Sequence, residues 1–337
     1  MKKAIILLLV LCLLLPGCTK TQKVTPSIPR QDRTVGIAVP DEGAWKQQAQ
    51  ALAAGFTELG YRTEVAYGEN DPLVQEKQLV SFLQQGISVL VLVCVDAVAL
   101  SQVCQQYKNA GVPIIAYDRM LTDTDWVKCY VACDYFAMGQ ALGNAVVNAR
   151  DLANAEVAAT VEFFMGSPED HSALLLYQGI MDVLKPYLQD GTLVCKSGRV
   201  AFEDTCMVDW SAQSAGQALE GYLQEYYTDT PLDICCTALD AMAASCIQVL
   251  TDAGYTAEDF PTVTGQGATP EAIDNLQGGK QAVTVAVDAE ALCRACVKIT
   301  DMLLYPKEGE SPAFTRSIHN HVTDVPSWLL EVSPVEG

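Results

Sequence analysis

The hydrophobic and polar positions of the chain alternate between two spacings, which predicts an ordered series of strands and helices. Short apolar runs bounded by glycine, proline or polar residues are typical of buried strands, whereas apolar residues three and four positions apart are typical of helices. Strands are expected at residues 34–39, 62–67, 89–95, 114–117, 127–133, 156–164, 193–199, 233–237, 261–265 and 282–287. Helices are expected at residues 45–59, 72–85, 97–110, 134–150, 169–188, 211–226, 241–253, 270–276 and 289–304.

This alternation runs once through the first half of the chain and then repeats, which predicts an α/β fold. The expected architecture is two doubly wound, Rossmann-like parallel-sheet lobes joined by a hinge, with a first crossing near Asp134. The N-terminal lobe is expected at residues 34–136 plus 288–308, and the C-terminal lobe at residues 137–287 plus 309–332. Because open α/β sheets bind ligands outside the carboxyl ends of their strands, a cleft between the lobes is the expected site.

The stretch from residue 112 to residue 119, Val-Pro-Ile-Ile-Ala-Tyr-Asp-Arg, places an acid and a guanidinium directly after a short buried strand. Asp118 and Arg119 then lie at the carboxyl end of that strand. A carboxylate accepts hydroxyl protons and a guanidinium offers a fixed fork of donors, so the pair suits a small polyhydroxylated molecule. From this stretch alone, a surface ion pair at a turn is an equally good interpretation.

The first residues have the features of an export signal. Two lysines precede an apolar run from residue 4 to residue 15, which is too short for a comfortable membrane span. The following Leu-Pro-Gly-Cys resembles the bacterial lipoprotein signal, in which residues 1–17 are cleaved and lipid is attached to Cys18. The alternative is an ordinary secretory signal in which Cys18 is incidental. Residues 18–33 read as a disordered tether, so the protein is expected outside the cytoplasm, anchored to the cell membrane.

The charge of the mature chain narrows the class of partner. Removal of Lys2 and Lys3 with the signal leaves 19 basic residues of the original 21 against 41 acidic residues, a formal charge of −22. Such a surface repels nucleic acid and anionic lipid head groups and favours solubility. Lipid on Cys18, rather than surface charge, is therefore the expected membrane contact, and no nucleic-acid partner is expected.

Other chemistries find little support in the sequence. Cys293 and Cys296 have the spacing of a metal or redox pair, but one face of a helix is the favoured interpretation. His319 and His321 have no third ligand nearby in sequence, so exposed strand positions are favoured over a zinc site. No phosphate-binding loop, nucleophile elbow or His-Glu-x-x-His motif is present. We expect no cofactor, no metal and no enzyme activity.

Several short motifs together resemble one protein family. They are Ile-Ala-Tyr-Asp-Arg-Met at 115–120, Gly-Ser-Pro-Glu-Asp at 166–170, Asp-Val-Leu-Lys-Pro-Tyr at 182–187, Leu-Val-Cys-Lys-Ser-Gly at 193–198, Val-Thr-Gly-Gln at 263–266 and Asp-Val-Pro-Ser-Trp-Leu-Leu at 324–330. The chain resembles the periplasmic sugar-binding proteins of type I topology from about residue 34 to residue 330. Within that family it is most similar to the xylose-binding and multiple-monosaccharide-binding proteins.

The resemblance implies a set of ligand-binding residues. Asp118 and Arg119 match the pair that grips sugar hydroxyls, and two aromatic positions match rings that stack on the C–H faces of a pyranose. Asp240 matches an acceptor of the second lobe, with a structural helix cap as the alternative. The other implied positions are the two aromatic residues, two strand-end acceptors and a loop residue: Trp45, Trp210, Asp96, Asp134 and His171.

The sequence also departs from the family pattern. Where the family has an arginine, this chain has Ala44, and where the family has two asparagines, it has His171 and Ser172. A further asparagine of the family is replaced by Leu239, an aspartate by Gly267 and a lysine by Val287. Each charge-assisted hydrogen bond contributes roughly 1.5–3 kcal/mol, so the loss of several would weaken pentose binding by orders of magnitude. The hypothesis that follows is a larger, less polar or modified glycoside as ligand.

The leading interpretation is a lipid-anchored solute-binding protein that delivers a carbohydrate-like ligand to ABC permease subunits and acts as a monomer. Closure of the lobes around the ligand would provide the signal. A ligand sensor that presents its closed form to a chemoreceptor or sensor kinase is the alternative, and neighbouring genes would distinguish the two. The export signal and the lack of a basic helix-turn-helix segment argue against a repressor core of the same fold. A hydrolase would need an acid/base pair, which the sequence does not single out.

Overall fold

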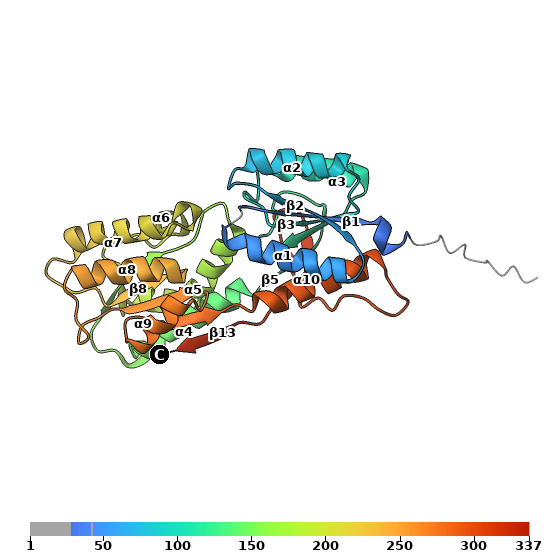
Figure 1. Cartoon of the computed structure of the whole chain (residues 1–337). Coiled ribbons are helices and arrows are strands. Elements are labelled where there is room, and N and C mark those ends of the chain that lie inside the picture. Colours follow the sequence, from blue (N-terminus) through green and yellow to red (C-terminus); the bar gives the residue numbers. More distant parts are fainter. Residues whose placement is uncertain (1–27, 42, 337) are drawn as a thin grey trace, which may run out of the picture.

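The computed structural model describes residues 28–41 and 43–336, with only the backbone of residues 43 and 44. The predicted signal peptide, Cys18 and most of the predicted tether lie outside these ranges. Within them, no helix combines the length and the apolar character that crossing a bilayer requires. Two α/β lobes lie end to end, each with helices on both faces of a mostly parallel sheet (Figure 1).

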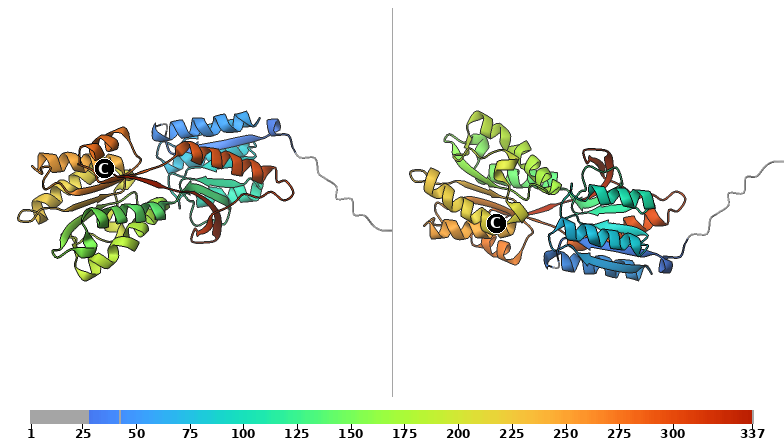
Figure 2. Two further views of the ribbon diagram at one scale, coloured as in Figure 1. Left: turned by 90° about the horizontal axis from the view of Figure 1, so that it is seen from below. Right: turned by 90° about the horizontal axis from the view of Figure 1, so that it is seen from above.

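Lobe one is built on a seven-stranded sheet in the order β11-β12-β5-β4-β3-β1-β2, in which only β11 is antiparallel to its neighbour. Helices α1 and α10 pack together on one face, and α2 and α3 cover the other face (Figures 1 and 2). The strands are β1 (Thr34–Val39), β2 (Arg62–Tyr67), β3 (Val89–Leu92), β4 (Ile114–Tyr117), β5 (Val127–Cys133), β11 (Arg316–His319) and β12 (Asp324–Leu330). The helices are α1 (Gly43–Glu58), α2 (Pro72–Gln84), α3 (Ser101–Ala110) and α10 (Ala289–Leu304).

Lobe two is built on a six-stranded sheet in the order β13-β10-β9-β8-β6-β7, in which β13 is antiparallel to β10. Helices α4 and α5 pack together on one face, and α7 and α8 on the other. The strands are β6 (Ala159–Phe164), β7 (Leu193–Val194), β8 (Ile234–Thr237), β9 (Thr262–Gln266), β10 (Val283–Ala286) and β13 (Ser333–Glu336). The helices are α4 (Tyr135–Ala149), α5 (His171–Asp190), α6 (Phe202–Thr205), α7 (Ala212–Tyr226), α8 (Asp240–Asp252) and α9 (Pro270–Gln277).

The two sheets share one strand order, which fixes where a ligand can bind. In lobe one the first five strands run β2-β1-β3-β4-β5, and in lobe two the corresponding strands run β7-β6-β8-β9-β10. In such a sheet the chain leaves β1 toward one edge and leaves β3 toward the other, and the same holds for β6 and β8 in lobe two. These opposite directions open a crevice at the carboxyl ends of the strands. Ligand-binding side chains are therefore expected on segments at the carboxyl ends of the two sheets, where the lobes face each other.

Three chain segments cross between the lobes and form the hinge. The first joins β5 to α4, the second joins β10 to α10, and the third joins β12 to β13. Asp134 and Asp288 begin the helices after the first two crossings, and each carboxylate accepts a bond from a backbone N–H three residues on, at 3.0 and 2.8 Å. Such N-caps end the crossings sharply and fix the start of each helix.

The packing of α4 against α5 depends on two glycines. A Cβ atom at Gly139 would lie 2.0 Å from the carbonyl oxygen of Leu176, and one at Gly179 would lie 2.1 Å from that of Phe136. The two helix backbones thus approach more closely than any side chain would permit. The first helix after the hinge is in this way held firmly to the body of lobe two.

The C-terminal segment corrects the predicted lobe boundaries. Residues 309–332 were expected in the C-terminal lobe, but β11 and β12 belong to the sheet of lobe one, where β12 pairs with β5. Burial alternates along β12, with Val325, Ser327 and Leu329 facing inward. Pairing there covers the edge of β5, which would otherwise be exposed. Only residues 333–336, as β13, return to lobe two.

Most predicted elements are present with shifted ends. The strand expected at 193–199 is reduced to Leu193–Val194, because residues 195–201 form a loop that turns around the carboxylate of Glu162. The helix expected from residue 97 begins at Ser101, after a turn capped by Asp96. None of the eleven cysteines in the described ranges is part of a disulfide, and Cys293 and Cys296 are buried on α10.

Candidate functional site

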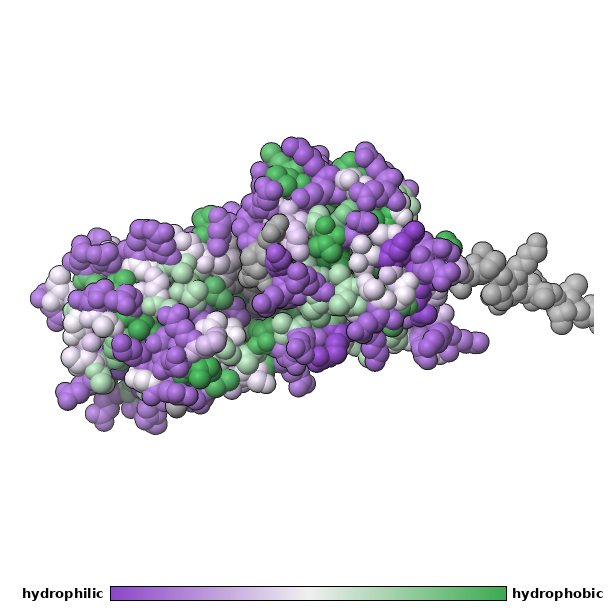
Figure 3. Space-filling model, viewed as in Figure 1, coloured by the Kyte–Doolittle hydropathy of each residue, from purple (hydrophilic) through white to green (hydrophobic). Residues whose placement is uncertain are grey.

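A cavity of about 250 Å³ lies between the lobes. The surface is hollowed at this junction, while hydrophilic side chains cover most of the outer faces (Figure 3). Lobe one contributes residues that follow β2, β3 and β4, including the first residue of α2, and lobe two contributes the loop after β6 and the segment before α7. The lining residues are Asn70, Pro72, Val95, Asp96, Arg119, Ser167, Glu169, Asp170, Val208, Asp209 and Trp210.

Asp118 is held behind this cavity by a rigid backbone. It has a left-handed conformation with φ of 63°, which is uncommon for a residue other than glycine. Its N–H donates to the carbonyl of Val131 at 2.8 Å, and its carbonyl accepts from the hydroxyl of Tyr130 at 2.7 Å. Its Oδ1 accepts from the hydroxyl of Tyr135, the first residue of α4, at 2.7 Å. Asp118 thus joins the strand end of lobe one to the helix that begins after the hinge.

Burial dominates the electrostatics of Asp118. The residue is only 9% exposed, and burial raises the pKa of its carboxyl to about 6, against the opposing hydrogen bond from Tyr135. The nearby charge of Asp170 raises this pKa further, and Arg119 lowers it. The raised pKa means that the folded state disfavours the charged form, so a ligand that donates hydrogen bonds here would stabilise the carboxylate.

Arg119 joins the two lobes directly. Its Nε lies 3.0 Å from Oδ2 of Asp170, and both side chains are largely buried, at 19% and 5% exposure. Its Nη1 donates to the carbonyl of Cys94 at 3.4 Å, and its guanidinium lies 5.8 Å from the ring centroid of Trp45. Because a guanidinium has five N–H donors, these contacts leave donors that can serve a ligand.

Asp170 organises the side of the cavity formed by lobe two. It precedes α5 as its N-cap, and its Oδ1 accepts from the backbone N–H of Ser172 at 3.0 Å. Its Oδ2 accepts from the indole Nε1 of Trp210 at 3.1 Å, in addition to the contact with Arg119. One carboxylate therefore fixes a helix start, an aromatic ring and the arginine of the opposite lobe.

Trp210 lies on a strained loop segment. Both Asp209 and Trp210 have positive φ, at 55° and 53°. A Cβ atom at Gly166 would lie 2.4 Å from the nearest atom of the Trp210 ring, so the indole packs directly on a backbone that only glycine permits. The backbone N–H of Asp209 donates to the hydroxyl of Ser167 at 3.2 Å. These contacts present an aromatic surface and an exposed carboxylate to the cavity.

The structure brings some predicted site residues together and not others. Arg119, Trp210 and Asp96 line the cavity, and Trp45 and Asp118 contact or flank Arg119. Asp96 uses Oδ1 to accept from the N–H groups of Val98 and Ala99, both at 2.8 Å. It is therefore both a turn residue and a wall of the cavity.

Asp134 and Asp240 both have structural contacts, and their role as acceptors for a ligand stays a prediction. Asp134 caps α4 and forms an ion pair with Arg316 of β11, beside the hinge. Asp240 is 2% exposed, and its oxygens accept from the side chains of Gln281 and Thr284 and from the N–H of Thr269. Neither lines the cavity. The alternative interpretation of Asp240 as a helix cap is wrong, because Asp240 is the first residue of α8 and bonds to neighbouring elements instead.

His171, the first residue of α5, lies at a second contact between the lobes. Its ring meets that of His321, from the segment between β11 and β12, edge-on with centroids 6.1 Å apart. Its Nε2 is buried without a hydrogen-bond partner among the described residues. Burial lowers the pKa of His171, as does the neighbouring His321, while Asp170 raises it. The neutral imidazole is therefore favoured at this interface.

The departures from the family pattern have local explanations where side chains are described. Ser172 binds Asp170 and is buried, and Leu239 and Val287 pack against the hydrophobic core. Gly267 has φ of 126°, and a Cβ atom there would lie 3.3 Å from Asp240. These positions serve packing and backbone geometry, and none lines the cavity.

Sequence reasoning missed four polar residues of lobe two: Ser167, Glu169, Asp170 and Asp209. Three of them belong to the Gly-Ser-Pro-Glu-Asp loop, which was read as a family motif and not as a ligand contact. The available signal was its position directly after a buried strand and before a helix, the same local pattern that singled out Asp118 and Arg119.

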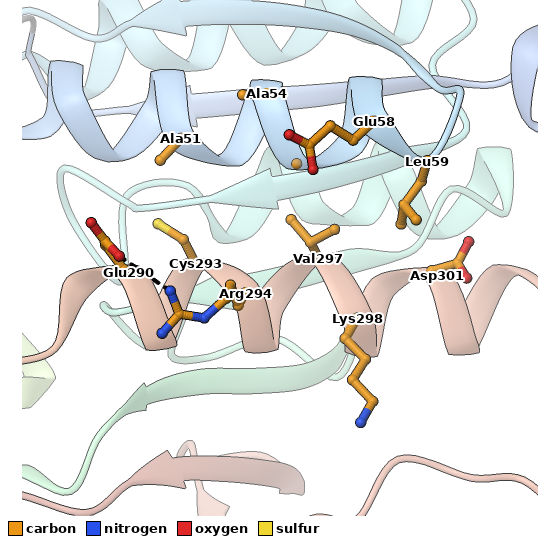
Figure 4. Close-up of a pocket in the computed structure, with 11 residues that line it drawn as sticks. Ala51, Ala54, Glu58, Leu59, Glu290, Cys293, Arg294, Val297, Lys298 and Asp301 are labelled. Carbon is orange, nitrogen blue, oxygen red and sulfur yellow. Dashed lines mark hydrogen bonds and ion pairs between the residues drawn. The ribbon is translucent and has the colours of Figure 1, made fainter.

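A larger cavity of about 550 Å³ lies on the outer face of lobe one, between α1 and α10. Figure 4 shows Ala51 and Val297 between the two helices, with Lys298 pointing away from α1. This groove lies on helix flanks, remote from the strand ends where polar groups converge, so we assign the site to the interlobe cavity. In the described part of the chain, no group of three or more side chains is arranged to hold a metal ion.

Comparison with known proteins agrees with this architecture. The model of the periplasmic binding protein domain matches residues 35–308. The chain belongs to the periplasmic binding protein family. A solved solute-binding protein of this family from Clostridium phytofermentans, with bound β-D-glucose, is 31% identical and superposes with a TM-score of 0.84 over 90% of this chain and 94% of that one.

Relatives with assigned functions point to the sugar-binding branch of the periplasmic binding proteins. The multiple sugar-binding periplasmic receptor ChvE of Rhizobium radiobacter is 31% identical over 91% of this chain and 88% of its own length. The multiple sugar-binding periplasmic protein SbpA of Azospirillum brasilense is 30% identical over 93% and 88%. The D-xylose-binding periplasmic protein of Escherichia coli is 27% identical over 94% and 91%. The predicted fold and family are confirmed.

Proposed function

We propose that this protein is a lipid-anchored extracytoplasmic receptor that captures one sugar ring between its lobes and delivers it to an ABC permease. Binding, and not bond cleavage, is its role. The proposal rests on a cavity whose opposite walls carry a guanidinium and an indole. This combination matches a sugar, which is polar at its hydroxyl rim and apolar on its C–H faces.

The size of the cavity supports a small ligand. Sites for drug-sized ligands occupy roughly 300–1,000 Å³. A volume of about 250 Å³ therefore suits one sugar ring better than the larger glycoside suggested by the sequence departures. The bound glucose of the Clostridium phytofermentans protein and the sugar binding named for the other relatives support the same class of ligand.

Closure of the lobes would couple binding to delivery. A ligand that contacts both Arg119 and Trp210 binds the closed form more tightly than the open one, and it shifts the population by that difference in affinity. The three crossing segments limit the motion to a hinge. The permease would then recognise a surface formed by both lobes that exists only in the closed form.

Calorimetric titration of the purified mature chain with D-glucose, D-xylose, D-galactose and myo-inositol tests the binding step. We expect saturable one-to-one binding of at least one sugar and a smaller radius of gyration in X-ray scattering when it is bound. Absence of binding across mono- and oligosaccharides would contradict the proposal.

The proposed lipid anchor is tested separately. Cells that express the full chain should incorporate a fatty-acid probe into the protein and retain it in the membrane fraction. Cys18→Ser should abolish the label and release the protein. Continued labelling of the Cys18→Ser variant would place the lipid elsewhere.

A further inference from the structure

The main chain of Asp118 is fixed by the sheet of lobe one, but its carboxylate is not. Both main-chain bonds go to β5: the N–H donates to the carbonyl of Val131 at 2.8 Å, and the carbonyl accepts from the hydroxyl of Tyr130 at 2.7 Å. The side-chain torsions remain, and they decide where the carboxylate points. In the described part of the chain, these torsions are restrained by the 2.7 Å bond from the hydroxyl of Tyr135 to Oδ1. Oδ2 is the oxygen left for a ligand.

Tyr135 belongs to the other lobe, because it is the first residue of α4. Asp134, directly before it, ends the first crossing: its N–H donates to the carbonyl of Leu330 in lobe one at 3.0 Å, and its carboxylate caps α4. A rotation of lobe two about this crossing therefore moves the hydroxyl of Tyr135 relative to Asp118. The bond between the two side chains thus depends on the angle between the lobes.

Asp118 and Arg119 both contact one pair of helices in lobe two. Tyr135 begins α4, and Asp170, whose Oδ2 lies 3.0 Å from Nε of Arg119, is the N-cap of α5. The close approach of the two helix backbones at their glycines makes α4 and α5 one unit. Closure therefore brings a partner to the carboxylate and a partner to the guanidinium in the same movement.

We propose that Tyr135 is a positioning residue for ligand capture: when the lobes close, its hydroxyl orients the carboxylate of Asp118 so that Oδ2 can accept from the ligand. This inference rests on the proposed function and adds to it a residue controlled by the hinge angle. In the closed form Asp118 is ordered before it meets the ligand, which strengthens binding because the ordering has already occurred. In the open form the bond is lost, and the weakened contact favours release.

The same bond affects the charge of Asp118. A donor to a carboxylate favours the charged form and lowers its pKa. Burial raises the pKa of Asp118 to about 6, and the bond from Tyr135 opposes this rise. Burial also raises the pKa of Tyr135, as does the charge of Asp118, so the hydroxyl stays protonated and remains a donor. The loss of this hydroxyl should therefore change how sugar affinity depends on pH.

The other titratable and charged groups around Asp118 come from three elements and from its own loop. They are Tyr117 of β4, Tyr130 and Cys133 of β5, Asp170 at the start of α5, and Arg119. Burial raises the pKa of the two tyrosines and of the thiol, so these three stay neutral, and the guanidinium stays charged. His171 follows Asp170, and burial lowers its pKa, so it titrates within the acidic range. Every variant used in the test keeps His171.

The test uses Tyr135→Phe, which keeps the ring and removes the hydroxyl. Calorimetry between about pH 5 and pH 8 would use the tightest binder among D-glucose, D-xylose, D-galactose and myo-inositol. In the wild type we expect affinity to fall on acidification with a midpoint near the pKa of Asp118, about 6. In Tyr135→Phe we expect affinity at about pH 7.5 to fall about tenfold, and the midpoint to rise by about one pH unit.

Tyr130→Phe is the matched control. It removes a buried hydroxyl at the same 2.7 Å from the same residue, but one that donates to the carbonyl of Asp118 and not to its carboxylate. It should leave the pH midpoint where the wild type has it, even if it lowers stability. An equal shift of the midpoint in both variants would mean that any loosening of this strand end has the effect, which would overturn the inference.

Two further measurements keep the result specific to Asp118. The carboxyl carbon of Asp118, followed by nuclear magnetic resonance in protein with ¹³C-labelled aspartate, should titrate at a higher pH in Tyr135→Phe and not in Tyr130→Phe. In an Asp118→Asn background, which has no buried charge at this position, Tyr135→Phe should have a much smaller effect on affinity. An undiminished effect there would show that Tyr135 acts through another group, and the inference would be wrong.

The outcomes separate the inference from the proposed function. If a sugar binds and Tyr135→Phe shifts neither the affinity midpoint nor the titration of Asp118, the inference is wrong and the sugar receptor stands. If the wild type binds none of the sugars, the proposed function is wrong, and the inference that rests on it is wrong with it.

Discussion

The two walls of the interlobe cavity are built in different ways. The wall of lobe one follows buried strands, and Asp118 is fixed beside Arg119 by hydrogen bonds from the hydroxyls of Tyr130 and Tyr135 and by one that its own N–H donates to the main chain. The wall of lobe two is a pair of loops, in which Asp209 is exposed and Trp210 adopts a left-handed conformation. The first wall is held by the sheet, and the second is held by a few side-chain contacts centred on Asp170.

Because of this difference, we expect the two walls to have different roles in ligand binding. Strand-end residues fixed by a sheet keep their geometry while the surrounding sequence changes, so they suit contacts that any sugar can make, such as a guanidinium fork to adjacent hydroxyls. Loops tolerate substitution and insertion, so they suit contacts that discriminate between sugars. We therefore expect changes on the first wall to affect affinity for every ligand and changes on the second to affect which ligand is preferred.

The strongest test of this division is Arg119→Ala. The variant removes the fork from the cavity and leaves the carboxylate of Asp170, 5% exposed, without its counter-charge. Breaking such a buried pair costs about 3–5 kcal/mol. We expect sugar affinity to fall by about a hundredfold or more and the midpoint of urea unfolding to fall with it.

A second variant separates the two effects of Arg119. Combining Arg119→Ala with Asp170→Asn removes the buried charge, so stability should largely recover while sugar binding stays lost. Full sugar affinity in either variant would show that the wall of lobe one does not supply the general contact.

The next largest effect is expected at Asp118. Its pKa of about 6 exceeds the ordinary value of 3.8, so the folded state takes up this proton at a higher pH than the unfolded chain. The buried charge therefore destabilises the fold above about pH 6, and this cost disappears as the pH falls toward about 4. Asp118→Asn keeps the shape, the bond from Tyr135 and a residue suited to positive φ.

At about pH 7.5 we expect Asp118→Asn to be more stable than the wild type by on the order of 1–3 kcal/mol, with weaker sugar binding. The gain should shrink toward zero as the pH falls to about 4. Unfolding by urea at several pH values measures it. A gain independent of pH would mean that the charge of Asp118 is not its cause.

A smaller change addresses the wall of lobe two. Gly166→Ala would place a methyl group 2.4 Å from the Trp210 ring, so the ring must move out of position. We expect affinity to fall by about tenfold, since aromatic contacts contribute roughly 0.5–1.5 kcal/mol beyond the area they bury. The preference among sugars should change as well, and calorimetry with several sugars measures both.

The matched control is Gly221→Ala in α7, where an added Cβ atom has no neighbour within 4 Å. It should leave binding unchanged and stabilise the helix by up to about 1 kcal/mol. If Gly166→Ala lowered affinity for every sugar by the same factor, the two walls would not differ in the proposed way.

The smallest effect concerns the contact between the lobes at His171. Because burial lowers the pKa of His171, the folded state binds this proton less readily than the unfolded chain. The wild type therefore loses stability as the pH falls below about 6.5. His171→Phe keeps an aromatic ring and removes the titration, so it should lessen that loss by roughly a few tenths of a kcal/mol, because solvent screens a partly exposed group. An unchanged pH profile would exclude His171 as a source of acid sensitivity.

Local patterns predicted the wall of lobe one better than the wall of lobe two. Asp118 and Arg119 were recognisable because an apolar run ends directly before them, and the strand-end rule requires no knowledge of distant contacts. The role of Asp170 depends on Arg119 of the other lobe and on Trp210, which lie 51 and 40 residues away in sequence. No local pattern of apolar and polar residues predicts that these three side chains come together.

Aspartates at junctions between strands and helices were ambiguous for a physical reason. Asp96, Asp134 and Asp240 all occupy such junctions, where a carboxylate can accept from a ligand or from the backbone. The structure places Asp96 in the cavity, Asp134 at the start of α4 and Asp240 in a buried network. The alternation along β12 was present in the sequence, but only the open edge of β5 decides which sheet receives it.

The first described residues are tied to lobe one alone. Arg30 forms an ion pair with Asp301, and the hydroxyl of Tyr305 donates to the carbonyl of Ile28, at the end of the molecule farthest from lobe two (Figure 1). The chain that precedes Ile28 is therefore attached to lobe one. If that chain is tethered at a surface, lobe one keeps its position and lobe two is the lobe that moves on closure. Each time a ligand binds, the same half of the molecule would then change its position relative to that surface.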